Sequence, residues 1–232
     1  MATHHVDDNG RRVAADPDLS RLYHDTRERL ILLLSALDDA ALATQVPACP
    51  AWSVREVVAH LSAVSQDVLA GRLTRIATEE ETAAQVARFK DHDLAGILAA
   101  WEDVAPPFER LVGSLGAWPA VVDIASHEHD IRAAVGKPGG RDAEVVWQSA
   151  GWLLTRLRAP VPLRVRVEDT EFRAGPGNGT ELRLTTSRFE AFRWRMGRRS
   201  RAQLARLDWS GDPSPVLDHL TIFGPAAADI VE

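Results

Sequence analysis

The sequence predicts an α+β protein in which an N-terminal bundle of helices precedes a small C-terminal α/β domain. Apolar residues recur every three or four positions through much of residues 19–157, which is the period of an amphipathic helix. After Pro160 and Pro162 the period changes to alternation, the pattern of a half-buried strand. We therefore expect a helical domain at 18–158 and a second domain at 162–232, preceded by a flexible polar arm at 1–17.

Composition indicates a folded protein of the reducing cytoplasm. The one cysteine, Cys49, cannot form an internal disulfide. No apolar run approaches the ~20 residues of a membrane span, and the first residues lack the apolar core of a signal peptide. The net charge is −6 and most basic residues alternate with acids, so nucleic acid is not an expected partner. We expect a cytoplasmic protein with no membrane or nucleic-acid partner.

The helices of the first domain follow from periodicity and from the residues that begin and end them. Ser53 and Glu56 have the spacing of a capping box, so a helix begins at Ser53. Pro106 and Pro107 are expected to kink or divide the third helix, and Gly136 ends the fourth. The expected helices are at about 19–37, from Ser53 onward, 94–115, 118–135 and 142–157.

The second domain is predicted from alternating and turn-forming residues. Strands at 163–167 and 181–185 flank the glycine-rich segment 175–179, and we expect the two strands to pair as a hairpin. A helix at about 187–203, a short strand at 207–209 and a last helix at 214–222 complete the expected unit.

One helix carries a concentration of acid and imidazole groups. Asp123, His127 and Asp130 lie at i, i+4 and i+7, so they project from the same side. From this spacing alone, a solvated ion pair is the better interpretation. His60, on the helix that begins at Ser53, is by itself best read as a satisfied boundary histidine. Together, however, His60, Asp123 and His127 would supply three metal ligands from facing helices and leave one coordination position open, as in catalytic zinc sites.

Two segments resemble a known family. Residues 49–61, CPAWSVREVVAHL, are similar to the C-P-x-W-[ST]-V-[RK]-[DE]-x-x-x-H-L motif of the mycothiol-dependent maleylpyruvate isomerase family. Residues 123–136 resemble its second motif, an acid, three positions, and then H-E-x-D-x-R-x-A-x-G. The resemblance implies a DinB-like four-helix bundle with His60, Asp123 and His127 as metal ligands. Asp123 stands where the isomerases proper have glutamate, which is one methylene longer.

Arginines near the C-terminus form the strongest basic cluster. A charged helix face is the simple interpretation of residues 193–201. Alternatively, Arg198 or Arg199 faces the metal cleft and binds a substrate carboxylate, a role that suits a planar guanidinium. Residues 192–199 resemble the G-R element of the same family, which favours Arg198 as the catalytic residue.

Neighbouring side chains have less specific roles. We expect His129 at the surface, and Glu128 with Arg132 as an ion pair on the helix surface. Asp130 either accepts the free ring N–H of a ligating histidine or is solvated. Cys49 is expected to be packed and unreactive.

The resemblance implies that mycothiol is the thiol cosubstrate. A divalent metal, best matched by Zn²⁺ for this ligand set, would lower the pKa of the thiol for attack on a small electrophile. The expected function is therefore a metal-dependent S-transferase or cis-trans isomerase, acting as a monomer or homodimer. The alternatives are a DinB-like metal hydrolase, in which the open position holds water, and a noncatalytic ligand-binding or regulatory protein.

Overall fold

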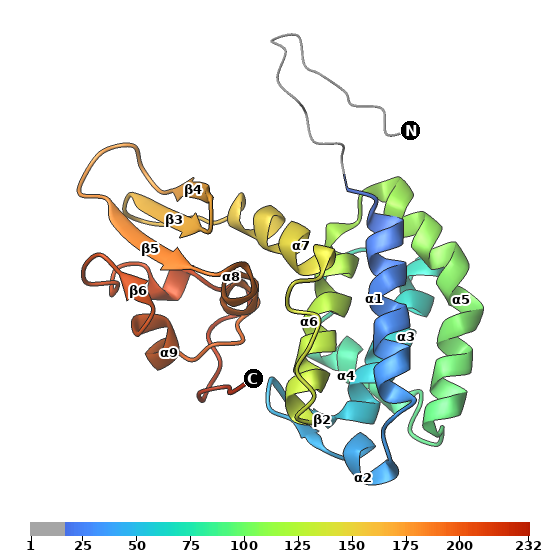
Figure 1. Cartoon of the computed structure of the whole chain (residues 1–232). Coiled ribbons are helices and arrows are strands. Elements are labelled where there is room, and N and C mark those ends of the chain that lie inside the picture. Colours follow the sequence, from blue (N-terminus) through green and yellow to red (C-terminus); the bar gives the residue numbers. More distant parts are fainter. Residues whose placement is uncertain (1–16) are drawn as a thin grey trace.

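The structure, a computed structural model, describes residues 17–232 (Figure 1). A helical bundle is followed by a small domain of strands and helices, so the predicted fold class is confirmed. The expected arm at 1–17 lies outside the described residues, apart from Pro17. Among the described residues, none of the helices has the length and apolar character that a bilayer crossing requires.

Four long helices form the bundle, with α1 and α3 each packing against α5 and α6. Three shorter helices accompany them, and residues 45–53 form a two-stranded ribbon that we did not predict. The elements of this domain are α1 (Leu19–Leu34), α2 (Asp39–Leu42), β1 (Gln45–Val46), β2 (Cys49–Ser53), α3 (Val54–Leu69), α4 (Glu79–Ala87), α5 (Leu94–Leu115), α6 (Trp118–Ala134) and α7 (Glu144–Leu154).

The start of α3 is set by the predicted capping box. The carboxylate of Glu56 accepts the backbone N–H of Ser53 at 2.7 Å, and Ser53 Oγ accepts the backbone N–H of Glu56 at 3.4 Å. These bonds satisfy two N–H groups that have no partner within the helix. They fix where the helix begins, and therefore which residues of α3 face α6.

The expected division of the third helix does not occur, because α5 continues through Pro106 and Pro107. Both prolines are exposed, as are Glu102 and Asp103, whose carbonyls lose their helical partners and are left on the solvent side. Trp101 and Phe108, on the opposite side, are buried in the core. Packing of that face holds the helix together where two hydrogen bonds are missing.

The C-terminal sheet differs from the predicted hairpin. The strand order is β4-β3-β5-β6, and β3 pairs antiparallel with β4 through a tight turn at Glu168, whose φ is 47°. β3 and β5 are parallel neighbours. Segment 175–179 is therefore a crossover rather than a hairpin turn. The strands are β3 (Leu163–Val167), β4 (Thr170–Ala174), β5 (Leu182–Thr186) and β6 (Asp208–Trp209).

The helix expected at 187–203 is two helices, α8 (Arg188–Arg195) and α9 (Arg201–Ala205). Gly197 separates them with a φ of 77°, in the left-handed region that favours glycine. A side chain at this position would collide with the carbonyl oxygen of Gly224. The last expected helix is only a 3-10 turn, Leu217–His219.

Helix α8 lies between the two hydrophobic cores. Phe192 and Met196 belong to the core of the helical bundle, whereas Trp194, from the same segment, belongs to the core under the sheet. α8 therefore packs on both parts of the chain (Figure 1). We propose 18–158 and 162–232 as the two domains, with α8 as the element that joins their cores.

Candidate metal centre

The structure brings His60 of α3 together with Asp123 and His127 of α6. His60 Nε2 lies 3.8 Å from one oxygen of Asp123, and His127 Nε2 lies 3.5 Å from the other. One possible ligand atom from each residue lies within 4.8 Å of the other two. The imidazoles are buried, whereas the Asp123 side chain is 36% exposed, so the cluster is open to solvent beside Asp123.

The donor set fits a divalent ion. Ligands at ~2.1 Å from zinc in a tetrahedral site lie about 3.4 Å from one another, close to the separations seen here. The second nitrogen of each ring is held by a partner, at 3.1 Å between His127 Nδ1 and Asp130 and at 3.0 Å between His60 Nδ1 and Gln85. Such partners orient metal-binding imidazoles. Each ring therefore turns Nε2 toward Asp123.

The two imidazoles have opposite pKa shifts in the metal-free protein. Burial lowers the pKa of His60 to about 4, so this ring is neutral at pH 7. Burial also opposes the charge of His127, but the carboxylates of Asp123 and Asp130 outweigh it and raise the pKa to about 10. His127 therefore carries a proton that a metal ion must displace.

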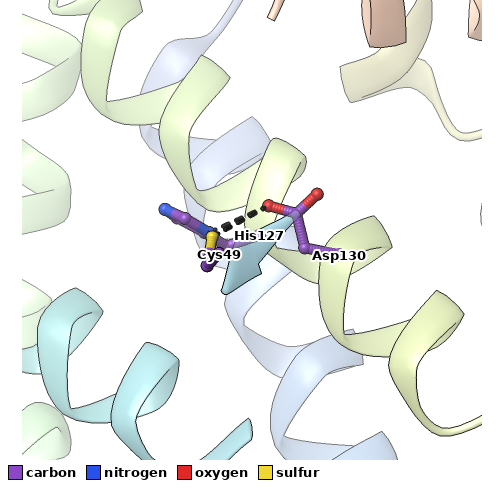
Figure 2. A group of neighbouring side chains, drawn as sticks. All are labelled: Cys49, His127 and Asp130. Atoms are coloured by element: carbon purple, nitrogen blue, oxygen red, sulfur yellow. Dashed lines mark hydrogen bonds and ion pairs between the residues drawn. The ribbon is translucent and has the colours of Figure 1, made fainter. Parts of the chain in front are cut away.

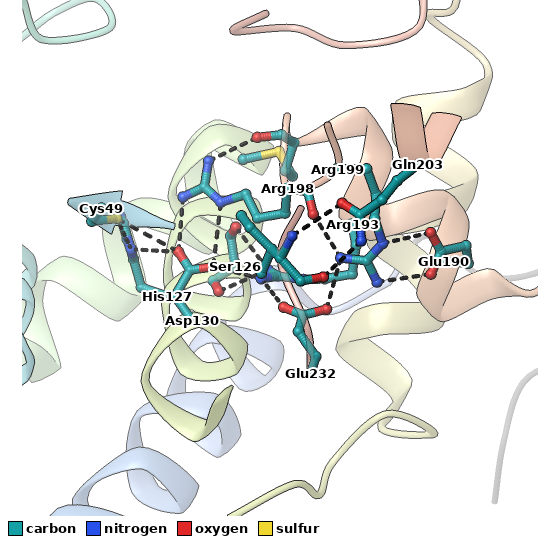
Figure 3. A network of polar contacts seen from close by, with 12 residues as sticks. Cys49, Ser126, His127, Asp130, Glu190, Arg193, Arg198, Arg199, Gln203 and Glu232 are labelled. Atoms are coloured by element: carbon teal, nitrogen blue, oxygen red, sulfur yellow. Dashed lines mark hydrogen bonds and ion pairs between the residues drawn. The ribbon is translucent and has the colours of Figure 1, made fainter. Parts of the chain in front are cut away.

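Asp130 connects the cluster to the C-terminal domain, and it is 1% exposed (Figure 3). Its carboxylate accepts from two arginines of that domain, Arg193 at 2.6 Å and Arg198 at 2.8 Å. Burial opposes ionisation of Asp130, but Arg198, Arg193 and His127 keep its pKa well below the ordinary value. Of the two alternatives for Asp130, the solvated one is therefore wrong, because the carboxylate is buried against His127.

Arg198 and Arg199 contact different residues, although they are neighbours in the sequence. Arg198 lies beside Asp130, and its side chain is 13% exposed. Arg199 instead pairs with Glu190 at 2.6 Å and Glu232 at 2.9 Å, on the far side of the network (Figure 3). The turn at Gly197 places the two guanidinium groups in different surroundings. Of these two residues, Arg198 is the one that contacts Asp130, which holds the ring of His127.

Cys49 lies beside His127, which the sequence did not suggest (Figure 2). Its Sγ is 3.9 Å from His127 Nδ1 and 3.8 Å from Asp130, because the unpredicted strand β2 passes over α6. Cys49, His127 and Asp130 form a second set of possible ligand atoms. However, His127 Nδ1 already contacts Asp130. The Asp130 carboxylate also accepts hydrogen bonds from Arg193 and Arg198. The first set, His60, Asp123 and His127, is therefore the candidate metal centre.

Two expectations about α6 are wrong. His129 is not at the surface, because it is 3% exposed and packs edge-on against Phe189, with ring centres 4.9 Å apart. Glu128 and Arg132 do pair at 3.0 Å, but Glu128 is fully buried and also pairs with Arg29 of α1 at 2.8 Å. The helix is covered by α1 and by the C-terminal domain. Glu128, His129 and Asp130 therefore face protein rather than water, in contrast to Asp123.

Fold and site define a protein with an N-terminal helical bundle, a small C-terminal sheet, and an imidazole–carboxylate cluster in the bundle that is open to solvent beside Asp123. Residues 23–158 match the family described as the mycothiol maleylpyruvate isomerase N-terminal domain. This match covers more than half of the chain, and the chain belongs to that family. No protein in a search of curated sequences matched significantly.

Two solved structures share the fold. A histidine-to-alanine variant of the mycothiol-dependent maleylpyruvate isomerase aligns with a TM-score of 0.55 and 14% identity, over 77% of this chain and 87% of that one. The crystal structure of the mycothiol-dependent maleylpyruvate isomerase aligns with a TM-score of 0.50 and 16% identity, over 77% and 88%. At this identity the likeness shows a common fold.

Proposed function

We propose that this protein is a metal-dependent enzyme that uses mycothiol in S-transfer to, or cis-trans isomerisation of, a small electrophile. The observation that supports this most is the convergence of two oriented imidazoles and Asp123 at a cluster open to solvent. A divalent ion held there supplies a Lewis acid that lowers the pKa of a bound thiol. Two nitrogen ligands and one oxygen ligand favour zinc.

The residues of the chain divide the remaining work. His60, Asp123 and His127 would hold the ion, and Asp130 holds the ring of His127. Arg198 would bind the carboxylate of the electrophile. Its guanidinium has five N–H donors, of which three bond to Asp130 and to the backbone carbonyl of Met196. The donors that remain can form charge-assisted hydrogen bonds to a substrate carboxylate.

The proposed activity is tested by assaying zinc-loaded protein with maleylpyruvate, with and without mycothiol. Isomerisation without net loss of thiol, or transfer with loss of one thiol for each product, supports the proposal. Turnover that needs zinc but no thiol would show a hydrolase. Zinc binding without any turnover of maleylpyruvate or other carboxylate-bearing electrophiles would show a noncatalytic protein. The last two outcomes contradict the proposal.

Arg198→Lys is expected to lower kcat/KM by about 10- to 100-fold, because a charge-assisted hydrogen bond contributes about 1.5–3 kcal/mol. Lysine keeps a positive charge beside Asp130 but cannot reproduce the planar fork. Zinc content should stay at that of the parent. Arg199→Lys is the matched control, because Arg199 contacts Glu190 and Glu232 rather than the cluster. Equal losses in both variants would contradict the assignment of Arg198.

Zinc affinity is expected to rise with pH, by about tenfold per pH unit between pH 6 and pH 8. The pKa of metal-free His127 is raised to about 10, so below that pH the ion must displace one proton from this ring. His60, with its pKa lowered to about 4, is already deprotonated over the same range. Competition with a chelator, corrected for protonation of the chelator, measures the slope. A flat dependence would contradict the role of His127.

A further inference from the structure

His60 makes a buried contact on the side of its ring that faces away from Asp123. Its Nδ1 lies 3.0 Å from Oε1 of Gln85, and Gln85 is the buried residue of α4. A neutral imidazole carries its single proton on one of two nitrogens, and hydrogen-bond partners decide which one. The orientation of the Gln85 amide therefore decides which nitrogen of His60 is free to bind a ligand.

Asp67 determines the orientation of that amide. Gln85 Nε2 donates to Asp67 Oδ2 at 2.9 Å, within the interior of the bundle. Arg72 and Arg88 also donate to this carboxylate, at 2.7 Å and 2.8 Å. Burial opposes ionisation of Asp67, but Gln85 and the two arginines outweigh it and lower the pKa. An ionised carboxylate only accepts hydrogen bonds, so the amide nitrogen must face Asp67 and the amide oxygen must face His60.

The opposite arrangement would place two acceptors against each other. If the Gln85 amide were reversed, its oxygen would lie 2.9 Å from Asp67 Oδ2. If instead the proton of His60 were on Nε2, the lone pair of Nδ1 would face Gln85 Oε1 at 3.0 Å. Buried polar groups without partners are costly. Nδ1 therefore carries the proton, and the lone pair of Nε2 faces Asp123.

We propose that Gln85 and Asp67 are positioning residues of the candidate metal centre, holding His60 in the tautomer whose Nε2 binds the ion. This inference rests on the proposed function for the identity of the ligand. The Nε2 atom is free for this role, because 3.8 Å from Asp123 is too long for a hydrogen bond. His60 and His127 are thus oriented differently, by a neutral amide in one case and by a carboxylate in the other.

The Asp67–Gln85 pair orients His60 without placing another charge beside the ring. The charge of Asp67 is separated from His60 by the length of the Gln85 amide, and it is compensated by Arg72 and Arg88. The pair therefore fixes the position of the ring proton through hydrogen bonds alone.

Asp67→Asn is the most direct test, because its effect on the amide can be derived. Both arginines donate to Oδ1, at 2.7 Å and 2.8 Å, whereas Oδ2 accepts from only one of them, Arg88, at a longer 3.1 Å. The new amide should therefore keep its oxygen at the Oδ1 position and turn its NH₂ toward Gln85. Gln85 must then present its oxygen to residue 67 and its NH₂ to His60. We expect the proton of His60 to move to Nε2 and the zinc affinity to fall by about 10- to 100-fold.

The tautomer is read by long-range ¹H–¹⁵N NMR correlation on the metal-free protein at pH 7, and the affinity by titration with zinc. In the parent, Nδ1 of His60 should be protonated and Nε2 unprotonated. The double variant Asp67→Asn/Gln85→Glu exchanges amide and carboxylate. The carboxylate introduced at position 85 accepts from both the new amide at position 67 and the Nδ1–H of His60, so Nδ1 should again carry the proton and the zinc affinity should rise above that of Asp67→Asn.

Glu81→Gln is the matched control, because Glu81 belongs to the capping box of α4 but does not contact the Asp67–Gln85 pair. It should leave tautomer and affinity unchanged. If Asp67→Asn does not fold, Gln85→Leu replaces it and should give a mixture of tautomers. An unchanged tautomer in the folded variants, or no recovery in the double variant, overturns the inference. If the parent binds no zinc but the tautomer changes as described, the proposed metal function fails and the role of the pair stands.

Discussion

His60→Ala and His127→Ala are each expected to abolish stoichiometric zinc binding and with it the thiol-dependent activity. Each removes one of three converging ligands, and the remaining two cannot complete a zinc site of this kind. Both rings are buried, at 6% and 5% exposure, and each is held by a polar partner, so alanine leaves no side-chain ligand in the place of the imidazole. His219→Ala is the matched control, because this histidine is exposed and distant in sequence from the cluster.

Metal analysis of purified, zinc-saturated protein measures the loss of zinc in the histidine variants, and circular dichroism verifies that the helices are intact.

Asp123→Asn should weaken zinc affinity markedly, because the anionic ligand is lost while the shape is kept. Asp123→Glu keeps the anionic ligand, one methylene longer, and should retain the ion, with an effect mainly on turnover. If zinc remains bound in both histidine variants, or if Asp123→Asn binds as tightly as the parent, the ligand set is wrong.

Asp130→Asn is expected to lower the free energy of unfolding by about 3–5 kcal/mol, the cost of breaking a buried ion pair from one side. Asp130 and Arg193 are fully buried, and Arg198 is nearly so. Without the carboxylate, two buried guanidinium groups lose their shared partner. The ring of His127 also loses the anionic acceptor for its Nδ1–H, so zinc affinity should fall in the same variant.

Chemical denaturation followed by tryptophan fluorescence measures this loss. Glu171→Gln is the control, because Glu171 pairs with Arg164 at 2.8 Å on the exposed face of the sheet and should leave stability nearly unchanged. Because Asp130 lies on α6 and both arginines come from the C-terminal domain, the transition should also become less cooperative. Equal stability of Asp130→Asn and Glu171→Gln would contradict the view that this network joins the two domains.

Local features of the fold could be predicted where neighbouring residues determine them. The capping box at Ser53 set the start of α3, and glycine at 136 follows the end of α6, as expected. The three candidate ligands could be selected because two motifs resembled a known family, and the structure does bring them together. Their binding of metal remains a proposal.

Pairing between distant segments could not be predicted in the same way. Alternating residues indicated the strands at 163–167 and 181–185 but not that these two strands are parallel, with β4 on the outer side of β3. A glycine-rich segment is compatible with a hairpin turn and with a crossover, because both need turns. The break at Gly197 was missed for a related reason, since it depends on the close approach of residue 224.

The sequence by itself determined the helical and strand periods, most helix ends and the side of α6 that carries Asp123 and His127. Only the tertiary structure decided which polar residues are buried and what they contact: Cys49 beside His127, Asp130 beneath two arginines, and Gln85 behind His60. The physical reason is that these partners are 25 to 78 positions apart. Helical spacing places a side chain on a face, but the environment of that face is created by the segments that pack upon it.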